Sequence, residues 1–384
     1  MDRGLYTDDH EAFREIVREF TAREVVGHLA EWDRNQSTGR DVWLTAGKQG
    51  IIGLTTPEEY GGPGLDDWRY RNVVYEELYR VGAGGLASSF SIQDDILTPY
   101  VTDMGTEEQK RRWLPPMAAG EAIMAVAMTE PGTGSDLRAV RTSAVKVPGG
   151  WKLNGAKTFI SSGQLADLVC VVAKTSPDAG TDAFSLLVVE AGMPGFERGR
   201  KLKKVGLWSQ DTSELFFQDV FVPEENLLGT EGRGFRQLMR HLPLERLAIA
   251  AGAVASAAAA LDWTVAYTKE RQAFGQPIAS FQNSLFTLAD LATELDVARA
   301  YLDKCILAHN TRTLTSVEAS KAKLFCTEMQ VKLIDKCLQL HGGYGYMLEY
   351  PIAKAYLDSR VQTIYGGTNE IQRQIIGRDL TGLR

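Results

Sequence analysis

Glu245 stands where the sequence is best suited to acid–base chemistry. It precedes Arg246 in HLPLERLAIAAG (241–252), which we expect to be the junction leading into a mostly apolar helix. A carboxylate in this setting is either the ion-pair partner of a neighbouring arginine or a base whose pKa is raised by an apolar pocket. The residues by themselves favour the ion pair.

A second candidate segment is QTIYGGTNEIQR (362–373), in which two glycines lie between an aromatic residue and Thr368, a residue type that caps helices. Gly366 and Gly367 would let the backbone approach a ligand closely. Neither glycine has a side chain with which to react. An acid or base at this loop must therefore come from another part of the chain.

The segment AMTEPGTGSDL (127–137) is the strongest local signal for a ligand-binding loop. An expected strand ends there in a proline and two glycines, so backbone N–H groups can turn toward a ligand. Thr129 and Ser135 add hydroxyl groups. A surface turn would have the same composition, and the residues alone leave these two interpretations about even.

Two more segments follow expected helices. ERQAFGQPIASFQ (270–282) places Arg271, Phe274 and Gln282 where they could meet a pyrophosphate and a ring, although an ordinary helix connection is the simpler interpretation. QLHGGYGYMLEYP (339–351) has glycines suited to a helix C-terminus and to close backbone approach. The alternative for these glycines is a helix terminator without further function.

Composition excludes several classes of protein. Of the 384 residues, 44% are hydrophobic and 24% are charged, as in soluble globular proteins, and the net charge of -7 argues against a nucleic-acid binder. The four cysteines form no Cys-x-x-Cys pair, which indicates buried thiols in a reducing compartment. The acidic N-terminus lacks the pattern of a signal or transit peptide, and the apolar run 247–261 is too short to span a membrane. We expect a cytoplasmic protein without membrane insertion.

Common catalytic signatures are absent from the sequence. It contains no G-x-G-x-x-G fingerprint, no Walker loop, no H-E-x-x-H and no G-x-S-x-G elbow. Five scattered histidines and no paired cysteines predict no metal site.

Periodicity divides the chain into three parts. Residues 1–120 are predicted to be helical, and a first helix begins near Asp8. Residues 121–231 contain short strands separated by turns, which predict a β-barrel or sandwich, with Asn154–Gly155 as the turn of a hairpin. Residues 232–384 are predicted to form a helix bundle. The predicted core-facing residues are Phe13, Ile16, Val17 and Phe20 on the first helix and Leu285, Leu288, Ala289, Ala292 and Leu295 on a bundle helix.

Taken together, five segments resemble the acyl-CoA dehydrogenase family in order and spacing, over nearly the whole chain. They are AMTEPGTGSD, FISSG, RQAFGQPIASFQ, QLHGGYGYMLEYPIAKAY and IYGGTNEIQR. The likeness is greatest to the long-chain members. It implies an α+β multidomain fold with an N-terminal helical domain, a middle β-barrel and a C-terminal four-helix bundle, in a homotetramer that carries FAD.

The resemblance also assigns cofactor contacts. Met128, Thr129 and Ser135 would line the flavin, Ser135 also the acyl-CoA thioester, and the segment Phe159, Ile160 and Ser161 would lie against the isoalloxazine. Many relatives have Trp where Phe159 stands. The residues that would contact the FAD of the adjacent subunit are Arg271, Phe274, Gln282, Gln339 and Gly343, and those that would contact the adenosine-diphosphate part of the chain's own FAD are Thr368 and Glu370.

Catalytic roles follow from the same resemblance. In short- and medium-chain members the loop reads Y-E-G-T and its glutamate is the base, whereas Gly366 stands at that position here. Long-chain and isovaleryl members take the base from the position matched by Glu245. We therefore expect Glu245 to remove the α-proton while hydride passes from the β-carbon to FAD. The Gly366 N–H would polarise the thioester, and Arg246 would lie near the CoA end or only brace its helix.

The expected reaction converts a medium-to-long straight-chain acyl-CoA to trans-2-enoyl-CoA in fatty-acid β-oxidation, with an electron-transfer flavoprotein as acceptor. A branched substrate such as isovaleryl-CoA is the alternative within the family. An oxidase or monooxygenase on the same fold would consume oxygen, and an oxidase would release hydrogen peroxide. A catalytically dead scaffold would purify colourless and free of FAD.

Overall fold

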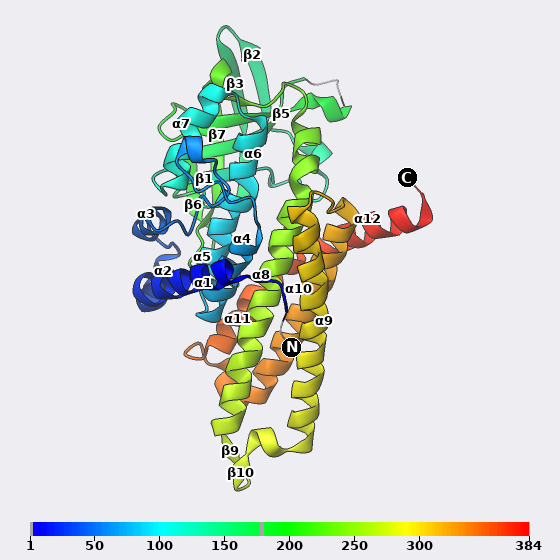
Figure 1. Cartoon of the computed structure of the whole chain (residues 1–384). Coiled ribbons are helices and arrows are strands. Elements are labelled where there is room, and N and C mark those ends of the chain that lie inside the picture. Colours follow the sequence, from blue (N-terminus) through cyan, green and yellow to red (C-terminus); the bar gives the residue numbers. More distant parts are fainter. Residues whose placement is uncertain (1–2, 177–179, 384) are drawn as a thin grey trace.

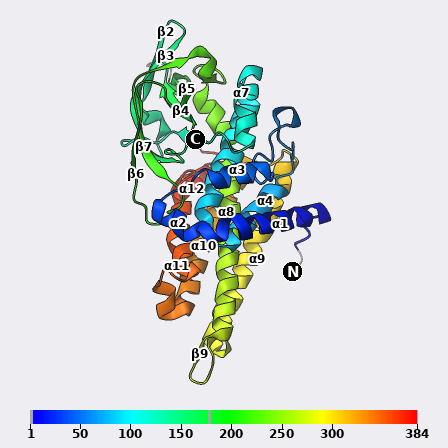
Figure 2. The same ribbon diagram turned by 90° about the vertical axis from the view of Figure 1, so that its left-hand side faces the viewer.

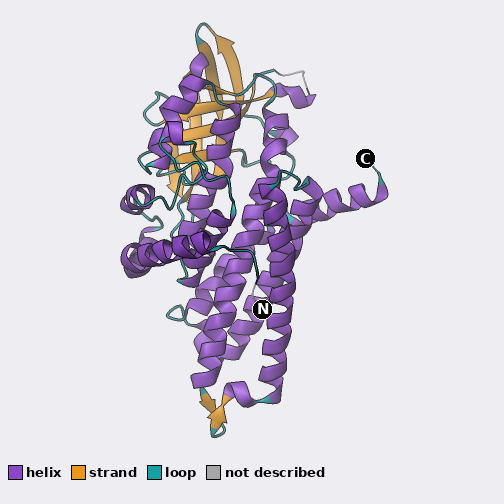
Figure 3. Ribbon diagram, in the orientation of Figure 1, coloured by secondary structure: helices purple, strands orange, loops and turns teal. Residues whose placement is uncertain are grey.

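The computed structural model describes residues 3–176 and 180–383, and it has helices, a β-sheet and a helix bundle in the predicted order (Figures 1 and 3). The sheet lies at one end of the molecule and the bundle extends to the other end. The first helices cross the molecule between them (Figure 2). The predicted α+β fold class is confirmed.

The N-terminal part is helical. Its elements are α1 (Asp8–Phe20), α2 (Leu29–Asn35), α3 (Asp41–Lys48), α4 (Arg69–Arg80), α5 (Gly84–Ser91), the π-helix η4 (Ile92–Leu97), α6 (Thr98–Met104) and α7 (Glu107–Ala118). As predicted, α1 begins at Asp8. Its buried face was predicted only in part, because Ile16 is 48% exposed while His10 and Arg14 are buried. Arg14 is buried because it pairs with Glu76 of α4 at 2.7 Å.

The middle part is one eight-stranded sheet, and it corrects the predicted barrel. The strands are β1 (Met124–Ala127), β2 (Ser143–Val147), β3 (Gly150–Ser161), β4 (Leu168–Lys174), β5 (Phe184–Glu190), β6 (Phe196–Lys201), β7 (Thr212–Pro223) and β8 (Leu227–Leu228). They pair in the order β6-β7-β3-β2-β4-β5-β8, and β1 adds to β4 in parallel. The sheet does not close, because among the described strands β6 and β8 do not pair with each other.

Strand β3 also corrects the predicted hairpin. Asn154 and Gly155 do not form a turn, since β3 runs without interruption from Gly150 to Ser161. Its pairing with β7 is irregular at two places, between Leu153 and Gly155 and again between Lys157 and Ile160. Gly155, at a φ of 151°, lies against Thr142 in a space that leaves no room for a Cβ atom. The turn glycine thus marks a bulge.

The C-terminal part is a bundle of long helices. Its elements are α8 (Gly234–Glu270), the small hairpin β9 (Gln272–Ala273) and β10 (Gln276–Pro277), α9 (Gln282–Asn310), α10 (Ser316–His341), α11 (Pro351–Ser359) and α12 (Asn369–Thr381). The apolar face predicted for α9 is largely wrong for the single chain. Leu295 is buried, but Leu285 is 52% exposed, and the helix buries Leu291, Ala298 and Leu302 instead.

Helix α8 runs through the hydrophobic cores. Its first turns contribute Leu238 to a core shared with α6, α7 and the sheet, and later turns contribute Leu247 to the core of the N-terminal helices and the bundle. By length and composition α8 could cross a membrane, but 83% of its most apolar window is buried inside the protein. It is a core helix, and Glu245 lies where the two cores meet.

The π-helix η4 is held by buried charges. Arg71 of α4 contacts Asp94 at 3.2 Å and Asp95 at 3.0 Å, and all three side chains are 1% exposed. Trp68 and Tyr75 also donate hydrogen bonds to Asp95, at 3.0 and 2.6 Å. Such π-helical turns often occur at functional sites. This cluster fixes the helix that forms one wall of the cavity described below.

Replacing Arg71 with Met should destabilise the fold by about 3–5 kcal/mol, because it leaves two buried carboxylates without their counter-ion. Burial raises the pKa of Asp94 to about 6 even with Arg71 in place, and removing Arg71 should raise it further. Protonation of Asp94 should therefore reduce the loss as the pH is lowered toward 6 and below. Urea unfolding at several pH values measures both effects. Arg80→Met is the control, because that half-exposed arginine pairs with Glu77 at the surface end of α4. Equal losses of unfolding free energy in the two variants would contradict the role of Arg71 as counter-ion of the buried carboxylates.

Candidate active site

Glu245 lies inside α8, eleven residues after its first residue, and not at a helix junction as predicted. Its side chain is buried, and its Oε1 accepts a hydrogen bond of 2.7 Å from the hydroxyl of Tyr100 in α6. Burial raises the pKa of Glu245, while the Tyr100 hydrogen bond and the positive charge of Arg246 oppose that rise. A raised pKa suits a base that must take up a proton near neutral pH.

Arg246 does not pair with Glu245. Its Nη1 donates to Ser316 Oγ at 2.8 Å and to Ser320 Oγ at 3.2 Å, both on α10. Among the described residues it has no carboxylate within 4 Å, so the ion-pair interpretation of Glu245 does not hold here. The arginine braces α8 against α10 and acts on the carboxylate only through space.

Glu245 borders a cavity of about 100 Å³. Gly366 and Ser161 also line this cavity, so residues from the C-terminal loop, the sheet and α8 meet there. Most of the remaining lining is apolar or aromatic. The other lining residues are Tyr75, Tyr79, Ser88, Ser91, Ile92, Ile96, Ala248, Ile249, Gly252, Gln362 and Tyr365.

The loop at Gly366 is held with its backbone exposed to the cavity. Gly366 and Gly367 have φ values of 63° and 82°, which favour glycine. Lys323 Nζ donates to Gly367 O at 3.0 Å, and Gln372 Nε2 donates to the same oxygen at 2.8 Å. Thr368 caps α12, as its position predicted. Within the described part of the chain the Gly366 N–H has no hydrogen-bond acceptor, so it is free for a ligand.

The segment after β1 is joined to β3. Thr158 N–H donates to Thr129 O at 2.9 Å, and Lys157 Nζ donates to Met128 O at 3.0 Å and to Glu130 Oε1 at 2.9 Å. Burial lowers the pKa of Lys157 to about 8, although Glu130 favours its charged form. Two segments singled out by the sequence therefore form one surface.

The residues of that surface point in different directions. Phe159 is 67% exposed and has a φ of 59°, in the irregular part of β3. Ile160 is buried in the sheet core, so its side chain faces away from a ligand. Ser161 faces the Glu245 cavity, while Ser135 lies exposed in the turn after β1. An exposed aromatic ring beside a polar loop provides a platform for a planar ligand.

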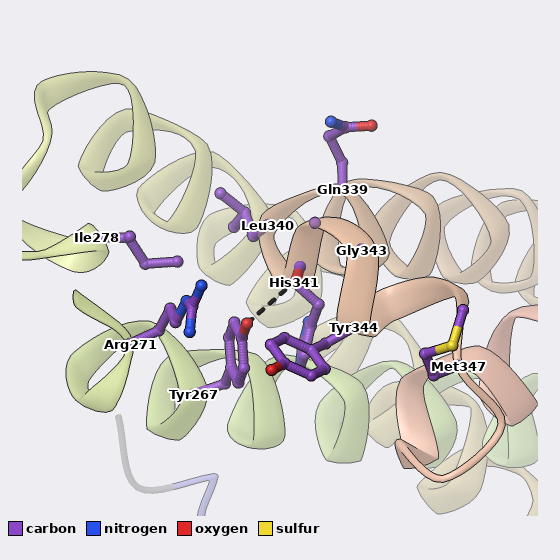
Figure 4. A pocket seen from close by; sticks show the side chains of 10 residues that line it. Tyr267, Arg271, Ile278, Gln339, Leu340, His341, Gly343, Tyr344 and Met347 are labelled. Atoms are coloured by element: carbon purple, nitrogen blue, oxygen red, sulfur yellow. Dashed lines mark hydrogen bonds between the residues drawn. The ribbon is translucent and has the colours of Figure 1, made fainter. Parts of the chain in front are cut away.

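Arg271, Gln339 and Gly343 meet in a different pocket, of about 520 Å³ (Figure 4). The Arg271 guanidinium lies 5.5 Å from the ring centre of Tyr344, and Tyr267 donates a hydrogen bond of 3.2 Å to His341 O. The other two residues predicted for this contact lie near the β9–β10 hairpin. They are Phe274, which is 96% exposed, and Gln282, which is exposed at the start of α9.

The predicted cofactor contacts thus lie in separate places of one chain. Thr368 and Glu370 border a further pocket of about 540 Å³ between α10 and α12. The β9–β10 hairpin near Arg271 is at the opposite end of the molecule from the sheet (Figure 1). A single chain therefore does not bring all predicted residues to one ligand.

Sequence reasoning missed Tyr100 and Ile249. Ile249 follows Glu245 by one helical turn, so the spacing i, i+4 could have identified it as a cavity residue. For Tyr100 the sequence holds no comparable signal, because the contact depends on how α6 packs against α8. A buried carboxylate and a free backbone N–H that border one apolar cavity form a site for deprotonating carbon beside a carbonyl group.

Comparison with known proteins identifies the class. Three acyl-CoA dehydrogenase family models match the chain: the N-terminal domain at residues 7–121, the middle domain at 125–220 and the C-terminal domain at 232–381. The protein belongs to the acyl-CoA dehydrogenase family, and it is an oxidoreductase that acts on an acyl-CoA.

Individual relatives cover almost the whole chain. The mitochondrial long-chain specific acyl-CoA dehydrogenase of Sus scrofa is 47% identical over 380 residues, which are 98% of this chain and 88% of that protein. The isovaleryl-CoA dehydrogenase of Solanum tuberosum is 36% identical over 378 residues, 98% of this chain and 91% of that protein. A crystal structure of acyl-CoA dehydrogenase from Geobacillus kaustophilus matches with a TM-score of 0.95 at 45% identity over 98% of both chains.

Members of this family are FAD-binding flavoproteins, and the residues present fit that group. The exposed ring of Phe159 offers a face to an isoalloxazine, and Arg271 beside Tyr344 offers a cation and a ring to a pyrophosphate and a base. A Cβ atom added to Gly343 would meet no atom within 4 Å, so the backbone there is open to a ligand.

Gly366→Ala should destabilise the loop by about 1–2 kcal/mol from its positive φ alone, and by more because the new Cβ would clash with Ile249 Cδ1. The additional loss should disappear in an Ile249→Val background, which removes that Cδ1 atom. A double-mutant cycle by urea unfolding measures the coupling. Gly61→Ala is the control, because that glycine also has a positive φ but open space around it. If Gly366→Ala costs the same unfolding free energy with Ile249 and with Ile249→Val, the clash with Ile249 is excluded.

Proposed function

We propose that the protein catalyses FAD-dependent α,β-dehydrogenation of medium-to-long straight-chain acyl-CoA thioesters to trans-2-enoyl-CoA, in fatty-acid β-oxidation. One observation carries the proposal: Glu245 is buried, free of any ion pair, and borders the same cavity as the unbonded N–H of Gly366. Identity of 47% to a long-chain enzyme supports the chain length, while the isovaleryl relative keeps a branched substrate as the alternative.

The residues divide the chemistry between them. The Gly366 N–H binds the thioester oxygen and stabilises the negative charge that develops when the α-proton leaves. Glu245 takes up that proton, and its burial excludes water that would weaken the base. FAD, when bound, accepts the hydride from the β-carbon. Ser161 lies at the cavity wall between the acyl group and the sheet surface.

The cofactor contacts that we propose follow the clusters described above. The sheet surface would hold the flavin, and the bundle residues would serve a neighbouring chain. The proposed set is Met128, Thr129, Ser135, Phe159, Ile160, Ser161, Thr368 and Glu370 for the chain's own FAD, and Arg271, Phe274, Gln282, Gln339 and Gly343 for the neighbour's. Ile160 would contribute through its backbone, because its side chain is buried in the sheet.

A homotetramer is part of the proposal. The apolar stripe that the sequence contains on α9 stays uncovered in the single chain, where Leu285, Phe286 and Val297 are more than half exposed. A second copy would bury this stripe and bring its Arg271 cluster to the first chain. We also propose a soluble, cytoplasmic enzyme that passes electrons to an electron-transfer flavoprotein.

Glu245→Gln should reduce the rate of anaerobic flavin bleaching by acyl-CoA by about 10²–10⁴-fold or more, because it removes the proton acceptor while preserving the shape of the side chain. Binding of acyl-CoA should survive. Glu107→Gln is the matched control, since Glu107 also accepts a hydrogen bond from a tyrosine but lies outside the cavity. Bleaching at the parental rate in Glu245→Gln would place the base elsewhere.

Gly366→Glu on the Glu245→Gln background should restore part of this rate, because it supplies a carboxylate from the loop. Adding Ile249→Val should improve the recovery by making room for the new Cβ.

The likeness to a long-chain enzyme predicts an acyl-chain optimum at about eight carbons or more. Each further buried methylene should add about 0.8 kcal/mol until the binding site for the chain is full. A panel of acyl-CoA substrates with an artificial electron acceptor measures the optimum. Ser88→Leu adds two heavy atoms to the cavity wall and should shift the optimum to shorter chains, whereas Ser88→Ala should leave it in place. Best activity of the parent on isovaleryl- or butyryl-CoA would refute the proposed chain length.

A further inference from the structure

Tyr100 is fully buried, and its hydroxyl is the hydrogen-bond partner of Glu245. It packs in a core with Leu97, Val101 and Leu238, which surround its ring with apolar side chains. Its ring centre is 4.9 Å from that of His241, one helical turn before Glu245. The tyrosine and the glutamate are therefore held on facing surfaces of α6 and α8.

The hydrogen bond occupies one carboxylate oxygen. Oε1 of Glu245 accepts from Tyr100, and within the described part of the chain Oε2 has no hydrogen-bond partner. A proton acceptor needs one free oxygen directed at the carbon acid, and the second oxygen must be fixed for that direction to be defined. Tyr100 supplies that fixed point from outside the cavity, since it is not among the residues that line it.

We propose that Tyr100 is a positioning residue for the catalytic base: its hydroxyl fixes Oε1 of Glu245, leaves Oε2 for the α-proton and tunes the pH at which the base is ionised. This inference rests on the proposed function of Glu245 as the base. Neither the family match nor the resemblance of the sequence motifs assigns a role to this tyrosine.

The other titratable groups near the base do not duplicate this role. Tyr75 donates to Asp95 and Ser91, and Tyr79 accepts from Gln362, so both hydroxyls are engaged elsewhere. The groups that face Glu245 or Tyr100 from the surrounding elements are Tyr75 and Tyr79 of α4, Tyr100 of α6, Cys170 of β4, His241 and Arg246 of α8, and Tyr365 of the loop before α12.

The tyrosine and cysteine neighbours stay protonated where the base titrates, whereas His241 has a lowered pKa and must be separated from the base by experiment. Burial raises the pKa of Tyr100, and the charge of Glu245 raises it further, so the hydroxyl remains a donor. Burial also raises the pKa of Cys170 to about 12 and lowers that of His241. The carboxyl group is therefore identified by its own infrared band, and the pH profile is compared with that band.

The direction in which Tyr100 shifts the pKa of Glu245 follows from its role as a hydrogen-bond donor. A hydrogen bond from a hydroxyl stabilises the carboxylate more than the carboxylic acid, so it lowers the pKa of Glu245. Removing the hydroxyl should raise that pKa and shift the ascending limb of the pH–rate profile to higher pH. At alkaline pH the base is ionised in either protein, so the rate should recover apart from the fraction lost because the carboxylate is no longer held in one orientation.

Tyr100→Phe in the FAD-loaded enzyme tests the proposal with octanoyl-CoA as the probe. The ascending limb of the anaerobic flavin-reduction rate should move up by about one to two pH units. At a pH below the midpoints of both proteins the reduction should be about 10–100-fold slower, while half-saturation by octanoyl-CoA stays within about twofold. Tyr60→Phe is the control, since Tyr60 belongs to the same core and donates a hydrogen bond of 2.8 Å to the half-exposed Glu107, away from the cavity.

An infrared titration of the protein without substrate gives a second readout. Difference spectra against Glu245→Gln identify the carboxyl band of Glu245, and its midpoint should rise in Tyr100→Phe but not in Tyr60→Phe. Site-specific 3-fluorotyrosine at position 100, a stronger donor of nearly the same shape, should shift the midpoint downward. This variant also serves if the phenylalanine variant does not fold.

The outcomes separate the two hypotheses. Slowing by the same factor at every pH, or an unchanged midpoint, would overturn the role of Tyr100 while the loss of activity in Glu245→Gln still supports the base. Full activity of Glu245→Gln would instead refute the base itself. Opposite shifts for phenylalanine and fluorotyrosine support the proposal.

Discussion

The burial of one carboxylate is the constraint on which the rest of this site depends. Removing water from Glu245 disfavours its charged form, and that raises its pKa toward the range in which a base works. A full ion pair with Arg246 would cancel this effect, but the arginine is turned to two serines of α10. The single hydrogen bond from Tyr100 stabilises the negative charge of the Glu245 carboxylate without adding an opposite charge.

Buried cations hold η4, the segment after β1 and the loop at Gly366. Arg71 binds the carboxylates of η4, Lys157 binds the carbonyl of Met128, and Lys323 binds the carbonyl of Gly367. Burial lowers the pKa of both lysines to about 8, so each depends on its oxygen partners to remain charged at neutral pH. Apolar packing fixes α8, whereas directional hydrogen bonds from these cations fix the loops around it.

Local patterns in the sequence predicted much of this arrangement. The start of α1, the glycine loop at Gly366 and the candidate base follow from spacing, from turn chemistry and from the likeness to a family. The sequence did not predict contacts between distant segments. For example, Tyr100 is the partner of Glu245 only because α6 packs on α8. The bulge at Gly155 has the residues of a hairpin turn, and only pairing with β7 distinguishes the two. The stripe at Leu285 was predicted as core, yet one chain leaves it exposed.

With Glu245 in the cavity, both space and charge favour glycine at position 366. Both residues border one cavity of about 100 Å³, and Ile249 already occupies the space that a Cβ atom at position 366 would need. A second carboxylate there would also place two like charges in one buried site, which raises the pKa of one of them and favours its protonated form. In the proposed mechanism the loop therefore contributes only its backbone N–H, and helix α8 holds the base. Dividing the two tasks in this way would keep the N–H free to stabilise charge on the thioester while Glu245 takes up the proton.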